Sequence, residues 1–411
     1  MNSRVSIVKT KKGAGQEEIS RAVRRSLDFI GGPENIFSAG QMVLINPNWA
    51  AARVKREEAV ITLPEVTKAV ADLVTAQGAR ALIAESSAIG VDSEKVIQAS
   101  GYNDLRKQGY EVVDLKKTPT IMLPVEDGRV LKELETYQLV QEADLIVTVP
   151  KLKTHDQAEV TCALKNSKGL LSDDFKRRFH WEFGLYDAVV DMNTLIKPVL
   201  AVVDAIVCQE GLGPVFGRPV EMGLIVAGRD LAAVDSVCGR IGGFEPEEAP
   251  ITLRAAERGL GVVDLDQIKV VGERIEDVAR RFLRASEDDP VMVEGFQIIT
   301  GETTCTGCRT TTMSALKDMK TSNLLKYLKG VVVITGQDAV IPEGVSAARV
   351  VHVGKCIPKE QRGRHYAPGC PPSMTLVADK IVGVTEKDKK VVGKANEETG
   401  AFYLELEERK V

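Results

Sequence analysis

The amino-acid sequence predicts an α/β fold, in which a larger domain with a mainly parallel sheet is followed by a second, smaller α/β domain. The first reason is that short β-branched runs alternate with segments of helical periodicity over residues 1–245, which is typical of βαβ units. The second is that several of these runs are apolar on both faces, as strands of a sheet covered on both sides must be. The third is the length, because 411 residues exceed what one hydrophobic core usually sustains.

The elements of residues 1–245 follow from these patterns. Strands are expected where β-branched residues cluster, and helices are expected where apolar residues recur every three to four positions. Pro64 near the start and Gly78 after the end of one segment are typical helix boundaries. The expected strands are 4–10, 42–48, 79–86, 110–115, 144–150, 199–207 and 222–228, and the expected helices are 17–30, 64–78, 93–102 and 229–243.

The rest of the chain divides into two parts. Residues 246–290 are charged and helical in pattern, which predicts a helical connector. Residues 291–411 are expected to form the smaller α/β domain, whose tail, 401–411, fits either a last strand or a short helix. The other elements expected in this domain are a helix at 311–328 and strands at 330–336, 348–354 and 379–385.

Charge and hydropathy limit the classes of partner. Lys and Arg (54) nearly balance Asp and Glu (58), and the formal net charge of -4 gives no overall basic field to attract nucleic acid or anionic lipid. The start of the chain lacks the apolar region of a signal peptide, and the most apolar run contains Asp204 and is too short to span a membrane. We therefore expect a cytoplasmic protein without a nucleic-acid or membrane partner. In that reducing compartment, clustered cysteines are better explained as metal ligands or redox groups than as disulfides.

Four of the seven cysteines lie in the smaller domain, in the segments GETTCTGCRTTT, GKCIPKE and YAPGCPPSM. Two cysteines separated by two residues can face one metal centre, and two further thiols complete a four-thiolate set. This set suits a [4Fe-4S] cluster. Zinc also accepts four sulfurs, although its structural sites usually come as two close pairs, and reduced thiols or a reversible disulfide are the plainer alternative. The predicted ligands are Cys305, Cys308, Cys356 and Cys370.

Two of these segments resemble known cluster-binding sequences. ETTCTGC followed far downstream by APGCPP resembles the cluster-binding segments of nickel–iron hydrogenase small subunits and of the related complex I subunit. The resemblance is confined to short segments within residues 302–372. It implies that the cysteine before two prolines is a cluster ligand, and it implies little about catalysis.

Lysines gather after the expected strand 144–150, in the stretch VTVPKLKTHDQAEVTCALKNSKG. Pro150 ends the strand, so Lys151, Lys153 and His155 follow at its carboxyl end, where open α/β sheets place their ligands. In an extended chain these alternating residues face one side. Lysine there can bind a carboxylate or phosphate, and histidine can move a proton near neutral pH. A solvated loop is the alternative.

Two segments resemble the domain-of-unknown-function family 362: PKLKTHDQAEVTCALKNSKGLL and, after His180, VVDAIVCQEGLGPVFGRPVEMGLIVAGRDLAAVDSV. The resemblance extends over roughly residues 40–245 and implies an α/β fold and association with iron–sulfur clusters, without an established reaction. Asn46 departs from the family, which commonly has Lys before Pro-Asn, and this predicts a different ligand contact. His180 is equally explained as a helix-surface residue. The candidate catalytic residues are His155, Lys153, His180 and Glu210, and the candidate substrate-binding residues are Lys151, Lys165, Asn166 and Lys168.

Three functional hypotheses follow. The protein is an oxidoreductase whose cluster exchanges electrons with a small anionic substrate, a lyase or isomerase of the aconitase type, or a non-catalytic electron-transfer or cluster-carrier protein serving a redox partner. Four cysteines can close every coordination position of a cluster, which disfavours the second hypothesis. A basic strand-end site favours the first over the third. The sequence contains neither fingerprint of ATP or dinucleotide binding, and it does not determine the substrate or the oligomeric state.

Overall fold

The computed structural model describes residues 3–51, 55, 58–289, 291, 293–302, 304–395 and 402–409. The larger domain is built on one ten-stranded sheet. Its strands are β1 (Arg4–Lys9), β2 (Met42–Pro47), β3 (Arg80–Glu85), β4 (Glu111–Asp114), β7 (Leu145–Val149), β8 (Lys151–His155), β9 (Glu159–Thr161), β10 (Leu200–Glu210), β11 (Arg218–Gly228) and β12 (Lys269–Gly272).

The order across this sheet is β12-β1-β11-β10-β7-β2-β3-β4, and β8 pairs with β10 and β9. The strands β7, β2, β3 and β4 are parallel, as is the pairing of β10 with β7. Strand β11 is antiparallel to β10, because the short connection between these two strands allows only a hairpin. On its other side β11 is antiparallel to β1. The predicted fold class, α/β with a mainly parallel sheet, is therefore confirmed.

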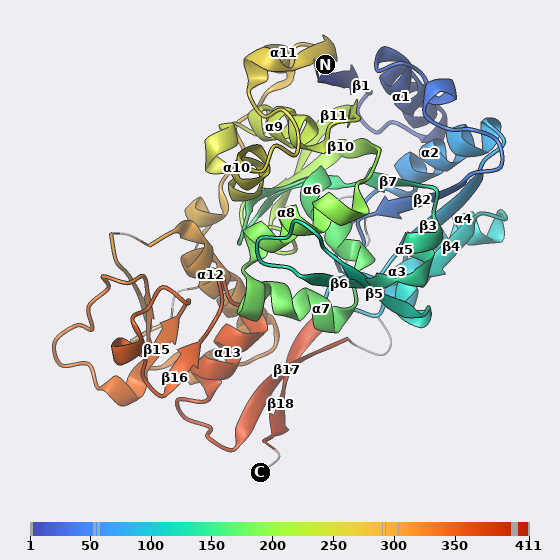
Figure 1. Ribbon diagram of the computed structural model, residues 1–411. Coiled ribbons are helices and arrows are strands. Elements are labelled where there is room, and N and C mark those ends of the chain that lie inside the picture. The colour runs from blue at the N-terminus through green and yellow to red at the C-terminus, as the bar shows by residue number, and fades with distance from the viewer. Residues whose placement is uncertain are drawn as a thin grey trace.

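Helices cover both faces of the sheet (Figure 1). Ile19, Val23 and Leu27 repeat at helical spacing and are buried against one face. Pro64 occupies the first turn of its helix, as its fixed φ favours. The helices are α1 (Gln16–Phe29), α2 (Pro64–Ala76), α3 (Ser93–Ala99), α4 (Tyr102–Lys107), α5 (Gln138–Glu142), α6 (Ala163–Asn166), α7 (Asp173–Arg178), α8 (Leu185–Ile196), α9 (Leu231–Ile241), α10 (Pro250–Glu257) and α11 (Ile275–Val278); a separate hairpin comprises β5 (Thr120–Pro124) and β6 (Glu133–Tyr137).

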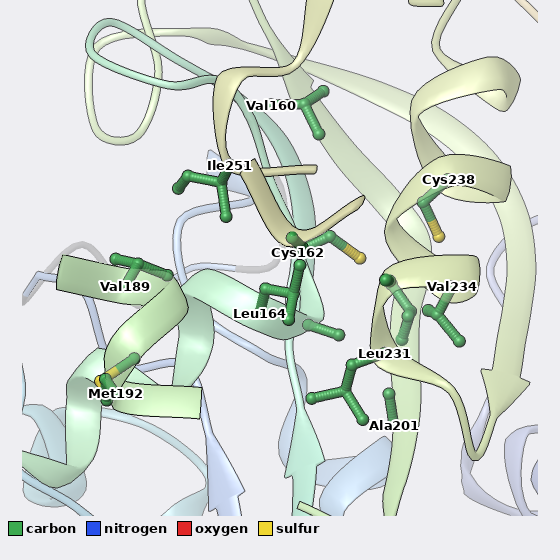
Figure 2. Packing of buried hydrophobic residues seen from close by; sticks show 14 of the residues in the cluster. Val160, Cys162, Leu164, Val189, Met192, Ala201, Leu231, Val234, Cys238 and Ile251 are labelled. Carbon is green, nitrogen blue, oxygen red and sulfur yellow. The ribbon is translucent and has the colours of Figure 1, made fainter. Parts of the chain in front are cut away.

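The core on the face formed by α6, α8 and α9 contains two cysteines. Figure 2 shows Cys162 and Cys238 among Leu164, Leu231 and Val234. Both thiols are buried and free, and so is the thiol of Cys208 on β10. These three cysteines lie in apolar or helical contexts, as the sequence indicates.

Residues 246–290 differ from the predicted helical connector. Strand β12 lies within them and joins the large sheet, where it pairs in parallel with β1. Helix α10 packs against α8 and α9 of the larger domain. The β-branched residues at 268, 270 and 271 are few, and Lys269 interrupts them, which hides the strand in the sequence. The first part of this segment thus belongs to the larger domain.

The smaller unit, with the cysteines, contains a four-stranded parallel sheet in the order β13-β14-β15-β16. It ends in an antiparallel hairpin of β17 and β18, so the undecided tail is a strand. Figure 1 shows this unit beside the larger domain, with the hairpin reaching below α7. Its elements are β13 (Gln297–Thr300), α12 (Thr306–Thr321), β14 (Val332–Thr335), β15 (Val350–Val353), β16 (His365–Ala367), α13 (Met374–Val382), β17 (Lys389–Ala395) and β18 (Phe402–Glu408).

The strand expected at 379–385 is wrong, because α13 extends to Val382. The Ser373 hydroxyl accepts a hydrogen bond from Leu376 N–H and caps this helix. Val377 and Ile381 are buried at helical spacing. The sequence signal was ambiguous, since a short apolar run fits either element until its cap is recognised.

Candidate functional site

A cavity of about 590 Å³ lies between the larger domain and the smaller unit. The smaller unit contributes to its wall from α12, α13 and β17, including Ser314, Met374, Leu376 and Val391. On the opposite side the wall comes from strands of the large sheet, among them β8, and from the loops and short helices that follow them. Six of the predicted site residues line it, namely Lys153, His155, Lys165, Asn166, Lys168 and His180.

Lys151 does not belong to this cavity. Its Nζ lies 2.8 Å from Asp204 Oδ2, and both side chains are fully buried. Strand β8 pairs with β10 at Lys151–Asp204 and again at Lys153–Gln209, with a shift of register between the two. This irregularity breaks the simple alternation that placed residues 151, 153 and 155 on one side. The assignment of Lys151 to substrate binding was therefore wrong, because the residue forms a core ion pair.

Lys153 lines the cavity but is bonded to protein groups. Its Nζ donates to Asn48 Oδ1 at 2.9 Å and to the Val60 carbonyl at 2.8 Å. Asn48 Nδ2 in turn donates to Asn166 Oδ1, and Asn166 Nδ2 donates to the Asn46 carbonyl. Burial lowers the pKa of Lys153 well below its ordinary value, and the charges of nearby lysines lower it further. Asn46, where the family commonly has Lys, is buried in this network and is not a cavity residue.

Lys165 is the cation left without a partner in this wall. In the described part of the chain its ammonium group has no hydrogen bond or ion pair. Burial lowers the pKa of Lys165 to about 8, and the carboxylate of Asp156 opposes that change. The side chain is thus mostly protonated at neutral pH. A desolvated cation that is not directly ion-paired or hydrogen-bonded is a favourable position for an anionic ligand.

Lys168 and His180, which also line the cavity, are in contact with each other. Lys168 Nζ lies 2.7 Å from His180 Nε2. Burial and the surrounding lysine charges lower the pKa of both groups well below their ordinary values. His180 belongs to a single turn of π-helix, Phe179–Phe183, and its ring is buried, so it is not a helix-surface histidine.

His155 is a buried imidazole that is neutral at neutral pH, because burial lowers its pKa to about 4 and the Lys165 charge contributes to the shift. Its Nδ1 lies 2.9 Å from Gln157 N and 3.0 Å from Asp156 Oδ1. The neutral ring accepts from Gln157 N–H in one tautomer and donates to the Asp156 carboxylate in the other.

Glu210 is wrong as a catalytic candidate. Its Oε2 accepts a hydrogen bond from Leu283 N–H at 3.0 Å, and its Oε1 lies 3.3 Å from Arg280. These bonds fix the segment after α11 to the end of β10. The residue is not part of the cavity wall.

The sequence reasoning missed Glu85 and Lys176, which also line the cavity. Burial raises the pKa of Glu85 to about 7, against the opposing charge of Lys176. A Cβ added at Gly169 would lie 2.5 Å from Glu85 Oε1, so the glycine of the KNSKG motif makes room for this carboxyl group. The available signal was the position of Glu85, a charged residue at the carboxyl end of a buried strand.

The four predicted ligand cysteines gather at one end of the smaller unit. Cys305 is the N-cap residue of α12, Cys308 follows in its first turn, and Cys356 and Cys370 lie in loops after β15 and β16. A Cβ added at Gly354 would lie 2.8 Å from Cys308 Sγ and 3.5 Å from Cys356 Sγ. The thiols of the other three cysteines all act electrostatically on Cys308, and together with burial they raise its pKa. One compact group of sulfurs results.

Within the described ranges, no three His, Cys, Asp or Glu side chains are grouped as ligands of a single metal ion. A four-iron cluster does not require such a grouping, because each thiolate binds a different iron. The absence of a side chain at Gly354 lets the backbone approach the sulfurs of Cys308 and Cys356 closely without displacing them. The residues present therefore fit a four-thiolate cluster.

Backbone and side-chain hydrogen bonds connect the cysteine loops to the cavity wall. Cys370 N–H donates to the His180 carbonyl at 3.1 Å, and Cys370 itself accepts from Leu185 N–H. Gln157 Nε2 donates to the Pro372 carbonyl at 3.0 Å. Thr310 in α12 donates to the Asp156 carbonyl. The turn after β8 and the π-helical turn thus each contact both the cavity and the cysteine group.

The family described as "Domain of unknown function (DUF362)" matches residues 43–240. The thylakoid-associated protein sll1697 of Synechocystis sp. (strain ATCC 27184 / PCC 6803 / Kazusa) is 30% identical over 248 residues, which are 58% of this chain and 74% of that protein. The chain belongs to the DUF362 family. The match confirms the resemblance seen over residues 40–245.

A solved structure, the lactate racemase apoprotein from Thermoanaerobacterium thermosaccharolyticum, is similar at 15% identity and a TM-score of 0.39, covering 93% of this chain and 91% of that one. Similarity at this level does not assign a reaction to the DUF362 chain. Across the residues that the structure describes, no helix has the length and apolarity needed to cross a membrane.

Proposed function

We propose that this DUF362 protein is an iron–sulfur oxidoreductase that binds an organic anion in the cavity between its two units. The observation that carries the proposal is the unpaired Lys165 ammonium in a cavity whose wall is hydrogen-bonded to the cysteine loops. An anion bound there would neutralise a desolvated charge. It would also lie next to the proposed redox centre.

The side chains of the wall have distinct proposed roles. Lys165 would bind the carboxylate or phosphate of the substrate as a point charge. His155 would exchange a proton with the substrate through Nε2, with Asp156 and Gln157 N–H as the partners of Nδ1. The Asn48–Asn166 pair would hold the Lys153 amine in place, so that the wall does not collapse on the ligand. Lys168 and His180 would fix the orientation of the bound anion.

Cys305, Cys308, Cys356 and Cys370 would hold a [4Fe-4S] cluster. Such a cluster would supply or accept single electrons beside the cavity. Cys305, Cys356 and Cys370 are exposed, which favours electron exchange with a redox partner protein at this surface. The proposed compartment is the cytoplasm, where thiols remain reduced and available as ligands.

A non-catalytic electron carrier is the second candidate, and the exposure of the three cysteines is the observation in its favour. A carrier has no need of a partly buried lysine without a hydrogen-bond or ion-pair partner in a cavity of this size. The two candidates therefore differ in anion binding. A lyase of the aconitase type would need an open coordination position, which four cysteine ligands do not leave.

The test is anaerobic purification followed by iron, sulfide and zinc analysis, with electron paramagnetic resonance before and after reduction by dithionite. We expect about four irons and four sulfides per chain and a signal that appears on reduction. Cys356→Ala should lose the signal, whereas Lys165→Ala should keep iron and signal unchanged. Stoichiometric zinc, or iron content independent of Cys356, would contradict the cluster assignment.

A further inference from the structure

Two buried polar atoms of the cavity wall have no hydrogen-bond partner among the described residues. They are Ser87 Oγ and Ser314 Oγ. Ser87 belongs to the larger domain, and Ser314 belongs to α12 of the smaller unit. Leaving a buried polar group unpaired is unfavourable. Unpaired groups on opposite walls indicate a ligand that reaches both.

Much of the wall between these polar groups is apolar. Ile89, Val215 and Phe216 line the cavity from the larger domain, and Met374 and Leu376 line it from α13. An inorganic anion or a very short acid bound at Lys165 would leave this surface in contact with water. A volume of about 590 Å³ instead falls within the range of cavities that enclose drug-sized organic molecules.

We propose that the substrate class is an amphipathic organic anion, an inference that rests on the proposed function of the same cavity. Its carboxylate or phosphate head binds Lys165, its apolar body lies between Phe216 and Leu376, and a hydroxyl or carbonyl at the far end pairs with Ser314. The ligand then contacts both units at once. Charge recognition comes from the DUF362 domain, whereas both units select the apolar body.

The experiment measures the binding of n-alkanoates and n-alkyl phosphates of increasing length to the anaerobically purified protein by titration calorimetry. Each added methylene group should tighten binding about fourfold, until the chain fills the cavity. Comparing the two series at equal length distinguishes a carboxylate head from a phosphate head. Acetate and inorganic phosphate should be the weakest ligands.

Three variants locate the apolar body and the far end. Ala88 is an exposed cavity residue, and Ala88→Trp should weaken the long ligands at least tenfold while leaving acetate unaffected. Ala99→Trp, also exposed but away from the cavity, is the matched control. Ser314→Ala should remove the advantage of an ω-hydroxyalkanoate over the plain alkanoate and leave the plain series unchanged.

The outcomes separate the two levels of inference. If binding depends on Lys165 but not on chain length, the amphipathic class is wrong and the anion site stands. If the affinity rises with the length of the alkyl chain but Ala88→Trp and Ala99→Trp have the same effect, the apolar body lies elsewhere and the inference is also wrong. If Lys165→Ala leaves the binding of every anion unchanged, the proposed function itself fails.

Discussion

Two lysines of one motif lie in opposite electrostatic surroundings. Lys151 is fully buried in the core, with its Nζ 2.8 Å from an Asp204 carboxylate oxygen. Lys165 lies in the cavity wall, where within the described chain it has no ion-pair partner. A charge neutralised inside the protein stabilises one arrangement of the chain, whereas an uncompensated charge in a cavity is positioned for a ligand. The two lysines should therefore respond oppositely to substitution.

The largest expected effect is at Lys151. Lys151→Met should lower the free energy of unfolding by about 3–5 kcal/mol, because it leaves the buried Asp204 carboxylate unpaired. Chemical denaturation of the anaerobic protein measures this change. The double variant Lys151→Met/Asp204→Asn should recover most of the loss, since it removes both charges and keeps an acceptor for Leu63 N–H. Equal instability of the single and double variants would contradict the ion-pair explanation.

Lys165 should show the reverse pattern. Lys165→Ala should weaken octanoate binding about tenfold to a hundredfold, because it removes one charged contact in a partly desolvated site. The free energy of unfolding should not fall, since the ammonium group has no protein partner to lose. Calorimetric titration and denaturation of the same preparation compare the two quantities. Loss of stability without loss of binding would make Lys165 a structural residue like Lys151.

The sequence predicted which residues gather but not how each is used. Lys153 and His155 lie in β8, which continues from the carboxyl end of β7, and Lys165 lies in the short helix that follows the next strand, so these three come together at one edge of the sheet. His180 reaches the same cavity from the π-helical turn after α7. Lys151 was misassigned because its partner depends on the shifted register between β8 and β10, which a single strand pattern does not contain.

Contacts between distant segments account for the other differences. Glu210 is bonded to Leu283, 73 residues away, and no local pattern indicates that pairing. Ser314 lies on the wall that the smaller unit contributes, and nothing in the sequence around it indicates that it faces a cavity. Whether a charged side chain is buried, and whether it has an ion-pair partner, depends on how the chain packs. These two properties distinguish the roles of the polar residues, and the sequence alone does not give them.

The pH dependence of anion binding should sharpen the comparison. Burial lowers the pKa of Lys165 to about 8, so the cation is present below that pH and is lost above it. The affinity for octanesulfonate, whose charge is fixed, should therefore fall as pH rises through about 8. Lys165→Arg should keep its charge and remove the contribution of Lys165 to this dependence. Burial also lowers the pKa of Lys176 to about 8 and raises the pKa of Glu85 to about 7, and these two cavity residues should keep their contributions in that variant. The dependence should therefore become weaker than in the wild type.

The smallest expected effect concerns Lys390, which lines the cavity from β17 and is half exposed. Its Nζ lies 3.2 Å from Glu407 Oε2, so its charge is both paired and solvated. Lys390→Ala should weaken octanesulfonate binding less than about threefold at low salt, because exposed charges interact weakly through water.

At about 0.5 M salt the Debye length is only a few ångströms, and the Lys390→Ala variant should then match the wild type. The Lys165→Ala loss should persist at that salt concentration, since its site is shielded from the solvent. Titration of the three proteins at both salt concentrations checks this. If Lys390→Ala and Lys165→Ala weakened octanesulfonate binding equally at high salt, the lack of an ion-pair partner would not explain the role of Lys165.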